Sequence, residues 1–188
     1  MSNVLLKNCR LSFVYLNEHK KMDDGSKRCS VCAAMSKMEF KKQKAAIEAA
    51  VKDAIDVGVK KGHFKRALTK TDSFNLPWYD ADQKMETGEH AERPELKGTI
   101  CFNPWNKKKV PVVGPDKQPI HDPDEIYSGM WAHVHVSLFP YGTGRPKKGV
   151  GAWLNAVMKI RDDVPLDGTV SAEEAFKEIE IMEDEDLE

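Results

Sequence analysis

Apolar and polar residues alternate over residues 4–16, which is the pattern of a β-strand with one buried face. One face would carry Leu5, Cys9, Leu11, Phe13 and Tyr15, and the other Asn8, Arg10 and Ser12. A polar stretch with a turn at Asp24-Gly25 follows, and residues 29–35 are then apolar again. We therefore expect two strands that pair as a hairpin.

The periodicity changes to 3.6 residues over positions 37–60. The apolar positions of this segment are Ile47, Val51, Ala54, Ile55 and Val59. The pattern predicts a long amphipathic helix that ends near Gly62. Lysines in its last turn would lie at the negative end of the helix dipole.

After this helix, an irregular segment precedes several further predicted strands. Residues 69–98 show no periodicity and carry prolines and many charges, which predicts a long excursion across the surface. Strand-like segments separated by turn residues follow at 98–103, 109–113, 130–139 and 150–160. Five or six strands interrupted by one long helix predict a mainly β fold, a small antiparallel barrel or sandwich with a helix at one end.

Residues 130–139 carry the most informative pattern. Ala132, Val134, Val136 and Leu138 form an apolar face, and Trp131, His133, His135, Ser137 and Phe139 form the other. Aromatic rings beside hydrogen-bonding side chains are typical of a platform on which unpaired bases stack. The alternative is a second buried face, covered by the helix or by residues 69–98.

Two other segments each combine an aromatic residue, a turn and a basic cluster. The first contains Phe102, Trp105, Lys107, Lys108 and Lys109, and the second contains Tyr141, Arg145, Lys147 and Lys148. Stacking a base while neutralising its phosphate requires this combination of side chains. With Tyr15 and Tyr127 as further candidates, two such segments favour nucleic-acid contact over an ordinary solvated surface.

Charge is distributed unevenly along the 188 residues, although 29 Lys+Arg nearly balance 30 Asp+Glu. Residues 1–161 hold 28 basic and 18 acidic residues, a difference of +10, whereas residues 162–188 hold one basic and 12 acidic residues, a difference of −11. A basic body predicts a polyanionic partner, and a separate acidic terminus predicts an interaction tail that repels polyanions. A merely solubilising tail is the alternative. Ser171 and Glu174 have capping-box spacing, which predicts a short helix through about Ile181 before a disordered acidic end.

Signals for metal or catalytic chemistry are weak. Cys29 and Cys32 have the spacing of half a zinc site, and His133 and His135 could add ligands, but residues three apart on a strand face opposite sides. Four cysteines fit the reduced thiols of a cytosolic protein. The carboxylates within 80–86 could hold Mg²⁺, although nothing in the sequence fixes their geometry. The start of the chain lacks a signal-peptide pattern and no apolar run could span a bilayer, so a cytoplasmic location is expected.

Several segments, in their order and spacing, resemble a family of bacteriophage single-stranded DNA-binding proteins. They are Leu11-Ser12-Phe13, residues 44–50, Val112-Val113, Gln118-Pro119-Ile120, residues 125–129, Phe139-Pro140-Tyr141 and Gly149-Val150. The similarity covers nearly all of residues 3–168. It implies an OB-fold, a five-stranded barrel that binds single strands, and a replicative role with an acidic C-terminal tail. The end Asp186-Leu187-Glu188 departs from tails of this class that finish on an apolar or aromatic residue.

These observations together predict a non-enzymatic OB-fold domain at residues 1–168 and an acidic tail at 169–188. The protein would coat and protect single-stranded DNA without strong sequence preference during phage DNA replication, recombination or repair, in the host cell cytoplasm. The residues expected to contact DNA are Tyr15, Phe102, Trp105, Lys107, Lys108, Lys109, Tyr127, Trp131, His133, His135, Phe139, Tyr141, Arg145, Lys147 and Lys148. The residues expected to bind replication or recombination proteins are Glu183, Asp184, Glu185, Asp186, Leu187 and Glu188.

No cofactor, metal or membrane contact is expected, and a homodimer is a candidate assembly. The main alternative function is a metal-dependent nuclease or nucleotide-processing enzyme. A protein-interaction module with a basic surface is the third hypothesis.

Overall fold

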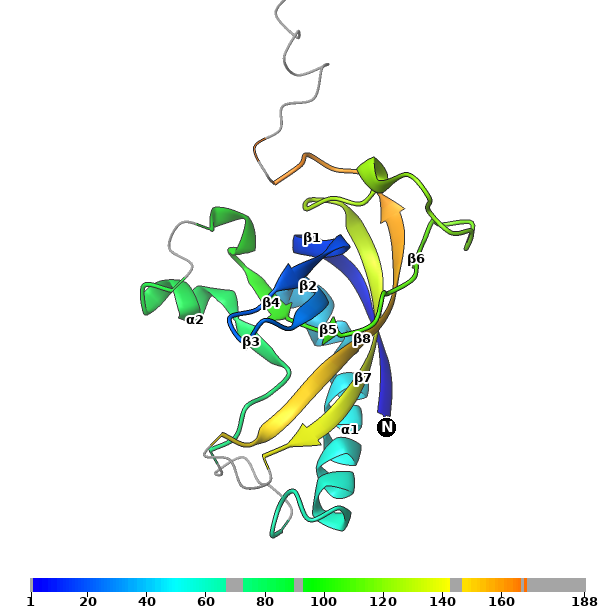
Figure 1. The fold of residues 1–188 in the computed structure, drawn as a ribbon. Coiled ribbons are helices and arrows are strands. Elements are labelled where there is room, and N and C mark those ends of the chain that lie inside the picture. Colours follow the sequence, from blue (N-terminus) through cyan, green and yellow to red (C-terminus); the bar gives the residue numbers. More distant parts are fainter. Residues whose placement is uncertain (1, 67–72, 90–92, 143–146, 167, 169–188) are drawn as a thin grey trace, which may run out of the picture.

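The chain forms a strongly curved β-sheet that closes on itself, with one long helix packed beside it (Figure 1). The computed structural model describes residues 2–66, 73–89, 93–142, 147–166 and 168. The strands are β1 (Ser2–Lys21), β2 (Lys27–Ser36), β3 (Trp78–Asp80), β4 (Thr99–Phe102), β5 (Trp105–Asn106), β6 (Val112–Val113), β7 (Trp131–Tyr141) and β8 (Gly149–Arg161). The helices are α1 (Lys37–Lys60) and α2 (Ala81–Glu86), with single 3₁₀ turns at Pro94–Leu96 and Pro123–Glu125.

Five strand positions form a closed ring. Strand β1 pairs with β7, β7 with β8, β8 with β5, β5 with β2, and β2 with β1. Strands β4 and β5 pair with successive parts of β2, so together they occupy one position. This ring confirms the predicted fold class, a mainly β OB-fold with one long helix. Five strands in a ring cannot all alternate in direction, and the β5–β8 junction is accordingly parallel, unlike the all-antiparallel barrel expected.

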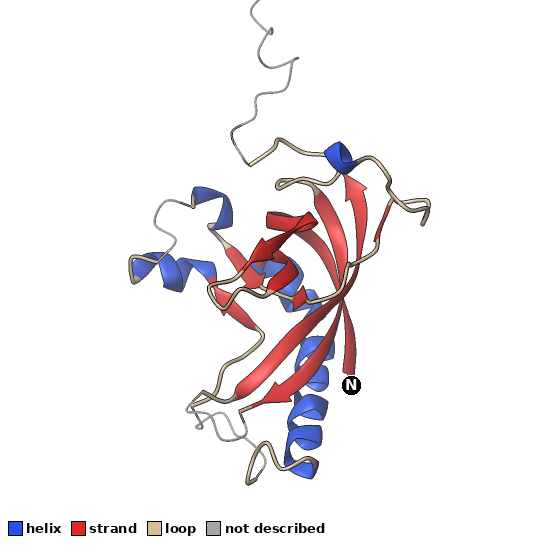
Figure 2. Ribbon diagram, viewed as in Figure 1, coloured by secondary structure: helices blue, strands red, loops and turns tan. Residues whose placement is uncertain are grey.

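Helix α1 forms where the periodicity predicts it. Its first turn is capped by Ser36, whose Oγ accepts a hydrogen bond of 3.1 Å from the backbone N–H of Glu39. Its buried residues are Ile47, Ala50, Val51, Ala54, Ile55 and Gly58. These side chains pack into the main core with β1 and β7, and Figure 2 shows the helix running along the outside of those strands.

Two irregularities in β1 change the faces predicted for this strand. The register against β7 shifts between Leu6 and Cys9, where Asn8 has a φ of 54°, and the register against β2 shifts again near Phe13, whose φ is 49°. An extra residue in one strand turns the side chains beyond it to the opposite face. The prediction that Leu5 shares the buried face of Cys9 is therefore wrong, since Leu5 is 44% exposed and Leu6 is fully buried.

Most of the described residues within 69–98 form regular elements that pack against the rest of the fold. Strand β3 pairs with β4, Ala81 and Leu96 are buried, and Trp78 packs against the main core. Lys37 joins this segment to α1, because its Nζ lies 2.9 Å from a carboxylate oxygen of Asp80 and 2.6 Å from one of Asp82. The predicted excursion is wrong for these residues, while 67–72 and 90–92 lie outside the described residues.

Two other predicted elements differ or are not described. The strand expected over 109–113 is reduced to β6, which pairs in parallel with β8. The helix expected from Ser171 lies outside the described residues, as does the acidic end of the chain.

Phe102, predicted as a DNA contact, is a core residue. Its side chain is 1% exposed, and its ring centroid lies 6.2 Å from that of Phe40 and 5.8 Å from that of Trp78. Helix α1 and strand β3 therefore enclose the ring, and it has no free face for a base. We remove Phe102 from the candidate surface.

We expect Phe102→Ala to lower the free energy of unfolding by about 3–5 kcal/mol, because it deletes a large buried ring and leaves a cavity. A urea titration followed by circular dichroism measures this loss, and DNA affinity at low temperature should be unchanged. A loss of stability below about 1 kcal/mol together with much weaker DNA binding would return this ring to the binding surface.

Candidate nucleic-acid interface

Four aromatic side chains from β5, β7 and β8 form a continuous row on the outside of the barrel. We name Tyr141, Phe139, Trp153 and Trp105 the aromatic stripe. Phe139 and Trp153 stack with ring centroids 4.5 Å apart and an angle of 22°, while Trp105 meets Trp153 edge-on at 4.3 Å. Tyr141 extends the row beyond Phe139 at 6.4 Å. All four side chains are half-buried, so their rings line the surface of the barrel.

Gly151 makes room for the row. It is the direct cross-strand partner of Phe139, and a Cβ at this position would lie 2.5 Å from Cζ of the phenylalanine ring. Any side chain there would lift Phe139 away from Trp153. A glycine inside a strand is a typical feature where another group must approach the backbone closely.

Arg28 adds a positive charge at the Trp105 end of the stripe. The carbon of its guanidinium group lies 4.1 Å from the centroid of the Trp105 ring, in cation–π geometry. Its Nε is buried, and within the part of the chain that the structure describes it has no hydrogen-bond partner. A buried donor left unpaired costs about 1–3 kcal/mol, so an acceptor that reached this guanidinium would relieve that cost.

Three members of the aromatic stripe, Trp105, Phe139 and Tyr141, line one wall of an open cleft of about 1330 Å³. The opposite wall consists of residues 74–80 and part of α2. Polar side chains in the cleft are Arg28, Asn75, Tyr79, Asp80, Gln83, Lys84, Thr87, Glu89, Asn103 and Lys107. Its two carboxylates are paired, Asp80 with Lys37 and Glu89 with Lys84, both at 2.9 Å. Pockets for a single drug-sized ligand measure about 300–1,000 Å³, so this larger, open cleft suits an extended ligand.

Asn75 fixes the opposite wall to the β7–β8 hairpin. Its backbone N–H donates to the carbonyl oxygen of Lys148, and its own carbonyl accepts from the N–H of Val150, both at 2.9 Å. Its side-chain Nδ2 donates to the hydroxyl of Tyr141 at 3.0 Å. Gly149 permits this approach, because a Cβ there would collide with the backbone of Asn75. The two walls are therefore held at a set spacing.

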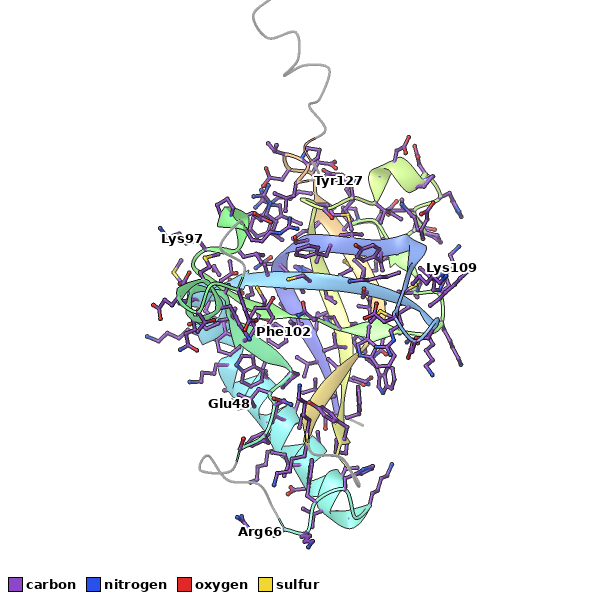
Figure 3. All side chains as sticks on the ribbon, turned by 60° about the vertical axis from the view of Figure 1, so that its left-hand side comes forward. Glu48, Arg66, Lys97, Phe102, Lys109 and Tyr127 are labelled. Atoms are coloured by element: carbon purple, nitrogen blue, oxygen red, sulfur yellow. The ribbon has the colours of Figure 1, made fainter. Side chains whose placement is uncertain are left out.

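Basic side chains flank both ends of the stripe. The exposed or half-exposed lysines are Lys107, Lys108 and Lys109 after β5, and Lys147 and Lys148 before β8. Figure 3 shows Lys109 on the outside of the molecule. Arg145, predicted in the second cluster, lies outside the described residues. A phosphate backbone that followed the stripe would meet positive charge at each end.

The β1–β2 turn lies beside the Trp105 end of the cleft. Hydrogen bonds from Ser26 hold the pKa of Asp24 in this turn below its ordinary value. The positive charges of Arg28 and Lys107 lower that pKa further. Arg28 and Lys107 therefore lie close enough to this turn to act on its carboxylate.

Tyr15 lies on the same outer row of the barrel without touching the stripe. Tyr15 pairs with Ser30 on β2, and Ser30 pairs with Trp105 on β5, so the three side chains share one face. The Nζ of Lys20 lies 5.3 Å from the centroid of the Tyr15 ring. The tyrosine is half-buried and remains a candidate for contact with a nucleic-acid strand that extends past Trp105.

The two histidines of β7 also face outward, as predicted, but they bond within the sheet. His133 Nδ1 accepts a hydrogen bond of 3.1 Å from the backbone N–H of Asn8. His135 Nδ1 lies 3.1 Å from Nδ2 of Asn155, which also donates to the hydroxyl of Ser137 at 2.6 Å. Both histidines lie beyond Trp153, outside the cleft.

Trp131 and Tyr127 are held by the segment that follows β8. Trp131 pairs with Arg161, at the opposite end of the β7–β8 pair from Tyr141 and Gly149. Trp131 Nε1 donates to Oδ2 of Asp163 at 2.7 Å, and the guanidinium of Arg161 covers the ring at 4.2 Å. The Tyr127 hydroxyl lies 2.7 Å from Oδ1 of Asp162. The structure therefore does not bring these two predicted contacts to the aromatic stripe.

Sequence reasoning missed two members of the site, Trp153 and Arg28. Trp153 lies on the same face of β8 as Gly151, the face opposite buried Leu154, and this alternation could have identified it as an outward-facing aromatic residue. Arg28 has no local signal, because it meets Trp105 only through the pairing of β2 with β5.

Within the described part of the chain, neither the cysteines nor the carboxylates form a recognisable metal site. Cys29 and Cys32 are buried in separate apolar clusters, which agrees with the prediction that they face opposite sides. Among the described residues, no three His, Cys, Asp or Glu side chains converge on a point that could hold a metal ion. Within the same residues, no helix is both long enough and apolar enough to cross a membrane.

The chain is similar to known proteins in both sequence and fold. Residues 2–187 match the family described as "Enterobacter phage Enc34, ssDNA-binding protein". The single-stranded DNA-binding protein from bacteriophage Enc34, solved in complex with ssDNA, has a TM-score of 0.71 at 22% identity, over 88% of this chain and 89% of that chain. Gp2.5, a single-stranded DNA binding protein encoded by bacteriophage T7, has a TM-score of 0.60 at 14% identity, over 99% and 98%. No curated protein sequence matches significantly.

Proposed function

The chain belongs to the Enc34 family of single-stranded DNA-binding proteins, and from this membership and the cleft we propose that it binds single-stranded DNA along the aromatic stripe. It coats and protects single strands during phage DNA replication, recombination or repair. The observation that carries the proposal is a row of four half-buried aromatic rings, two of them stacked, with lysines at both ends.

The chemistry of the cleft explains binding without strong sequence preference. Every base has a face that can stack on an aromatic ring, so Phe139, Trp153 and Trp105 accept any base. Lysines beside the stripe neutralise phosphates, which are the same for every sequence. Arg28 combines both roles, since its plane lies on Trp105 and its donors suit a phosphate oxygen.

The position of the cleft agrees with the general binding surface of OB-folds. In such barrels, the second and third strands and the loops between strands 1 and 2 and between strands 4 and 5 bind oligonucleotides. In the ring described above, these are β2, β4 with β5, the turn at 22–26, and the connection from β7 to β8. Arg28, Trp105 and Lys107 belong to that set.

Binding in this proposal is stoichiometric and non-catalytic, and it takes place in the host cell cytoplasm. The alternative, a metal-dependent nuclease, requires turnover that a chelator abolishes. Incubation of a labelled oligonucleotide with Mg²⁺, with and without a chelator, separates the two hypotheses. Intact oligonucleotide and equal binding in both samples support the proposal, whereas chelator-sensitive cleavage contradicts it.

The acidic tail is proposed as a separate unit that regulates binding and recruits replication or recombination proteins. Residues 162–188, which include the tail, carry a difference of −11 against +10 on residues 1–161, so this end of the chain is attracted to the same surface as phosphates. Near the end of the described residues, the backbone N–H of Leu166 donates to the carbonyl of Ser128 at 2.8 Å and holds this segment to the barrel. The residues proposed to dock on partners are the last six, 183–188.

Stacking can be tested with two tryptophans in similar surroundings. Trp105 and Trp131 are both half-buried and both lie under an arginine guanidinium, at 4.1 and 4.2 Å. Trp105→Leu should weaken oligonucleotide binding by about 1–3 kcal/mol, the value of one base stacked on an aromatic ring. Fluorescence titration with poly(dT), which follows the remaining tryptophans, measures the change.

Trp131→Leu is the matched control, because it removes the same ring at the far end of the barrel. It should lower stability through loss of the bond to Asp163 and leave DNA affinity unchanged. The stacking assignment fails if the two variants lose the same affinity, or if only Trp131→Leu loses it.

Neutralising the cluster after β5 should reduce the salt dependence of binding. For single strands, log K falls against log salt with a slope of about −0.7 per phosphate contact, so replacing Lys107, Lys108 and Lys109 by Ala should make the slope shallower by about 2. Titrations between low and high salt measure the slope. An unchanged slope would remove this cluster from the site.

Removing the tail should strengthen DNA binding at low salt. A chain that ends at Asp167 keeps the bond between Leu166 and Ser128 but loses most of the acidic residues of 162–188. Its gain in affinity should shrink as salt rises and the Debye length falls toward about 8 Å. Recruitment of replication proteins should be lost. If the shortened chain binds no more tightly than the full chain at low salt, the tail does not compete with DNA.

A further inference from the structure

The end of α1 and the β7–β8 hairpin together present five lysines outside the cleft. They are Lys60, Lys61, Lys65, Lys147 and Lys148, and we name this group the basic pole. Four of them are exposed and Lys148 is half-buried. In Figure 3, Arg66 marks the same end of the molecule, just beyond the last turn of the helix.

Close packing brings the two parts of the basic pole together. Gly58, in the last turn of α1, lies against Pro140 near the end of β7, and a Cβ on Gly58 would be 2.8 Å from Cβ of the proline. Phe64 folds back onto the same glycine and is buried. Figure 1 shows the end of α1 beside the β7–β8 hairpin. The lysines therefore belong to one surface of the molecule.

The nearby described segments, residues 57–66, 73–77, 139–142 and 147–151, contain no carboxylate, and Asp56, one helical turn before Lys60, forms no ion pair with it. In the part of the chain that the structure describes, none of the five lysines forms an ion pair. Lysines elsewhere do pair, for example Lys37, Lys44 and Lys159. Uncompensated like charges repel one another, which favours an anionic ligand on this surface.

The helix dipole explains only part of this arrangement. Cations near the last turn of a helix stabilise it, which accounts for Lys60 and Lys61. The effect falls off within one turn, so it does not account for Lys65 or for the two lysines of the hairpin.

The basic pole continues directly from the cleft. The carbonyl of Lys148 accepts the hydrogen bond from Asn75 that fixes the opposite wall, and Lys148 contacts Gly142, next to Tyr141. The basic pole thus adjoins the Tyr141 end of the stripe, whereas the cluster after β5 adjoins the Trp105 end. A DNA single strand that crosses the stripe and continues past Tyr141 would reach these lysines.

We infer that the basic pole is a second binding surface for single-stranded DNA, on which the strand continues beyond the cleft through its phosphates alone; this inference rests on the proposed function. The aromatic residue of this surface, Phe64, is buried, so bases do not stack here. The basic pole therefore adds affinity and salt dependence only for strands long enough to reach past Tyr141.

The test compares short and long strands on one variant of the full chain. The variant carries Lys60→Gln, Lys61→Gln and Lys65→Gln, which remove charge from exposed sites at the end of α1 and just after it. Gln keeps a high helix propensity at position 60. The control carries Lys41→Gln, Lys44→Gln and Lys52→Gln, three exposed lysines of the same helix away from its end. Oligo(dT) of about 4 and about 16 nucleotides spans the range of site sizes for OB-folds.

The inference predicts unchanged affinity of the basic-pole variant for the short strand. For the long strand, affinity should fall by about tenfold or more and the salt slope should become shallower by about 2, because three lysines no longer neutralise phosphates. The control variant should match the unmodified chain with both strands. Circular dichroism and thermal unfolding verify that both variants fold.

Two results would overturn the inference. One is a long-strand affinity and slope equal to those of the control variant. The other is unchanged binding of both strands with altered self-association in sedimentation, which would assign the basic pole to the acidic tail of another copy. Failure of the unmodified chain to bind even the short strand would instead contradict the proposed function, so the two ideas fail separately.

Discussion

The parallel junction between β5 and β8 closes the barrel, and the proposed binding surface depends on it. The β5–β8 pairing consists of one residue pair, Trp105 and Trp153, supported by a hydrogen bond of 2.9 Å from Asn106 Nδ2 to the carbonyl of Leu154. Because the backbone ladder is so short here, contact between the two indole rings helps to close the ring of strands. The same rings form the middle of the aromatic stripe, so barrel closure and the proposed stacking use the same side chains.

The surroundings of this junction hold the rings in place before any ligand arrives. Arg28 covers Trp105, Gly151 lets Phe139 lie against Trp153, and Asn75 ties the opposite wall of the cleft to the β7–β8 hairpin. A surface ordered in advance loses little conformational entropy on binding, so more of the stacking energy appears as affinity. The lysines at both ends add attraction that does not depend on base sequence.

The sequence predicted those parts of the fold in which side-chain direction is decided within one element. The period of α1, the alternation of β7 and the two basic clusters are such cases. Prediction failed where direction depends on contacts from elsewhere: Leu5 faces outward because of a bulge, Phe102 is enclosed by α1 and β3, and Trp131 is covered by the segment after β8. Arg28 and Trp153 join the site only when the ring closes, and their partners are distant in sequence.

The most direct test of the central claim is photocrosslinking of the full chain to an oligo(dT) that contains 5-iodouracil, with the modified residues identified by mass spectrometry. The account predicts adducts on the aromatic stripe, at Phe139, Trp153, Trp105 or Tyr141, and their loss when unmodified oligo(dT) competes. Adducts confined to Trp131 at the far end of the barrel, with none on the stripe, would contradict it.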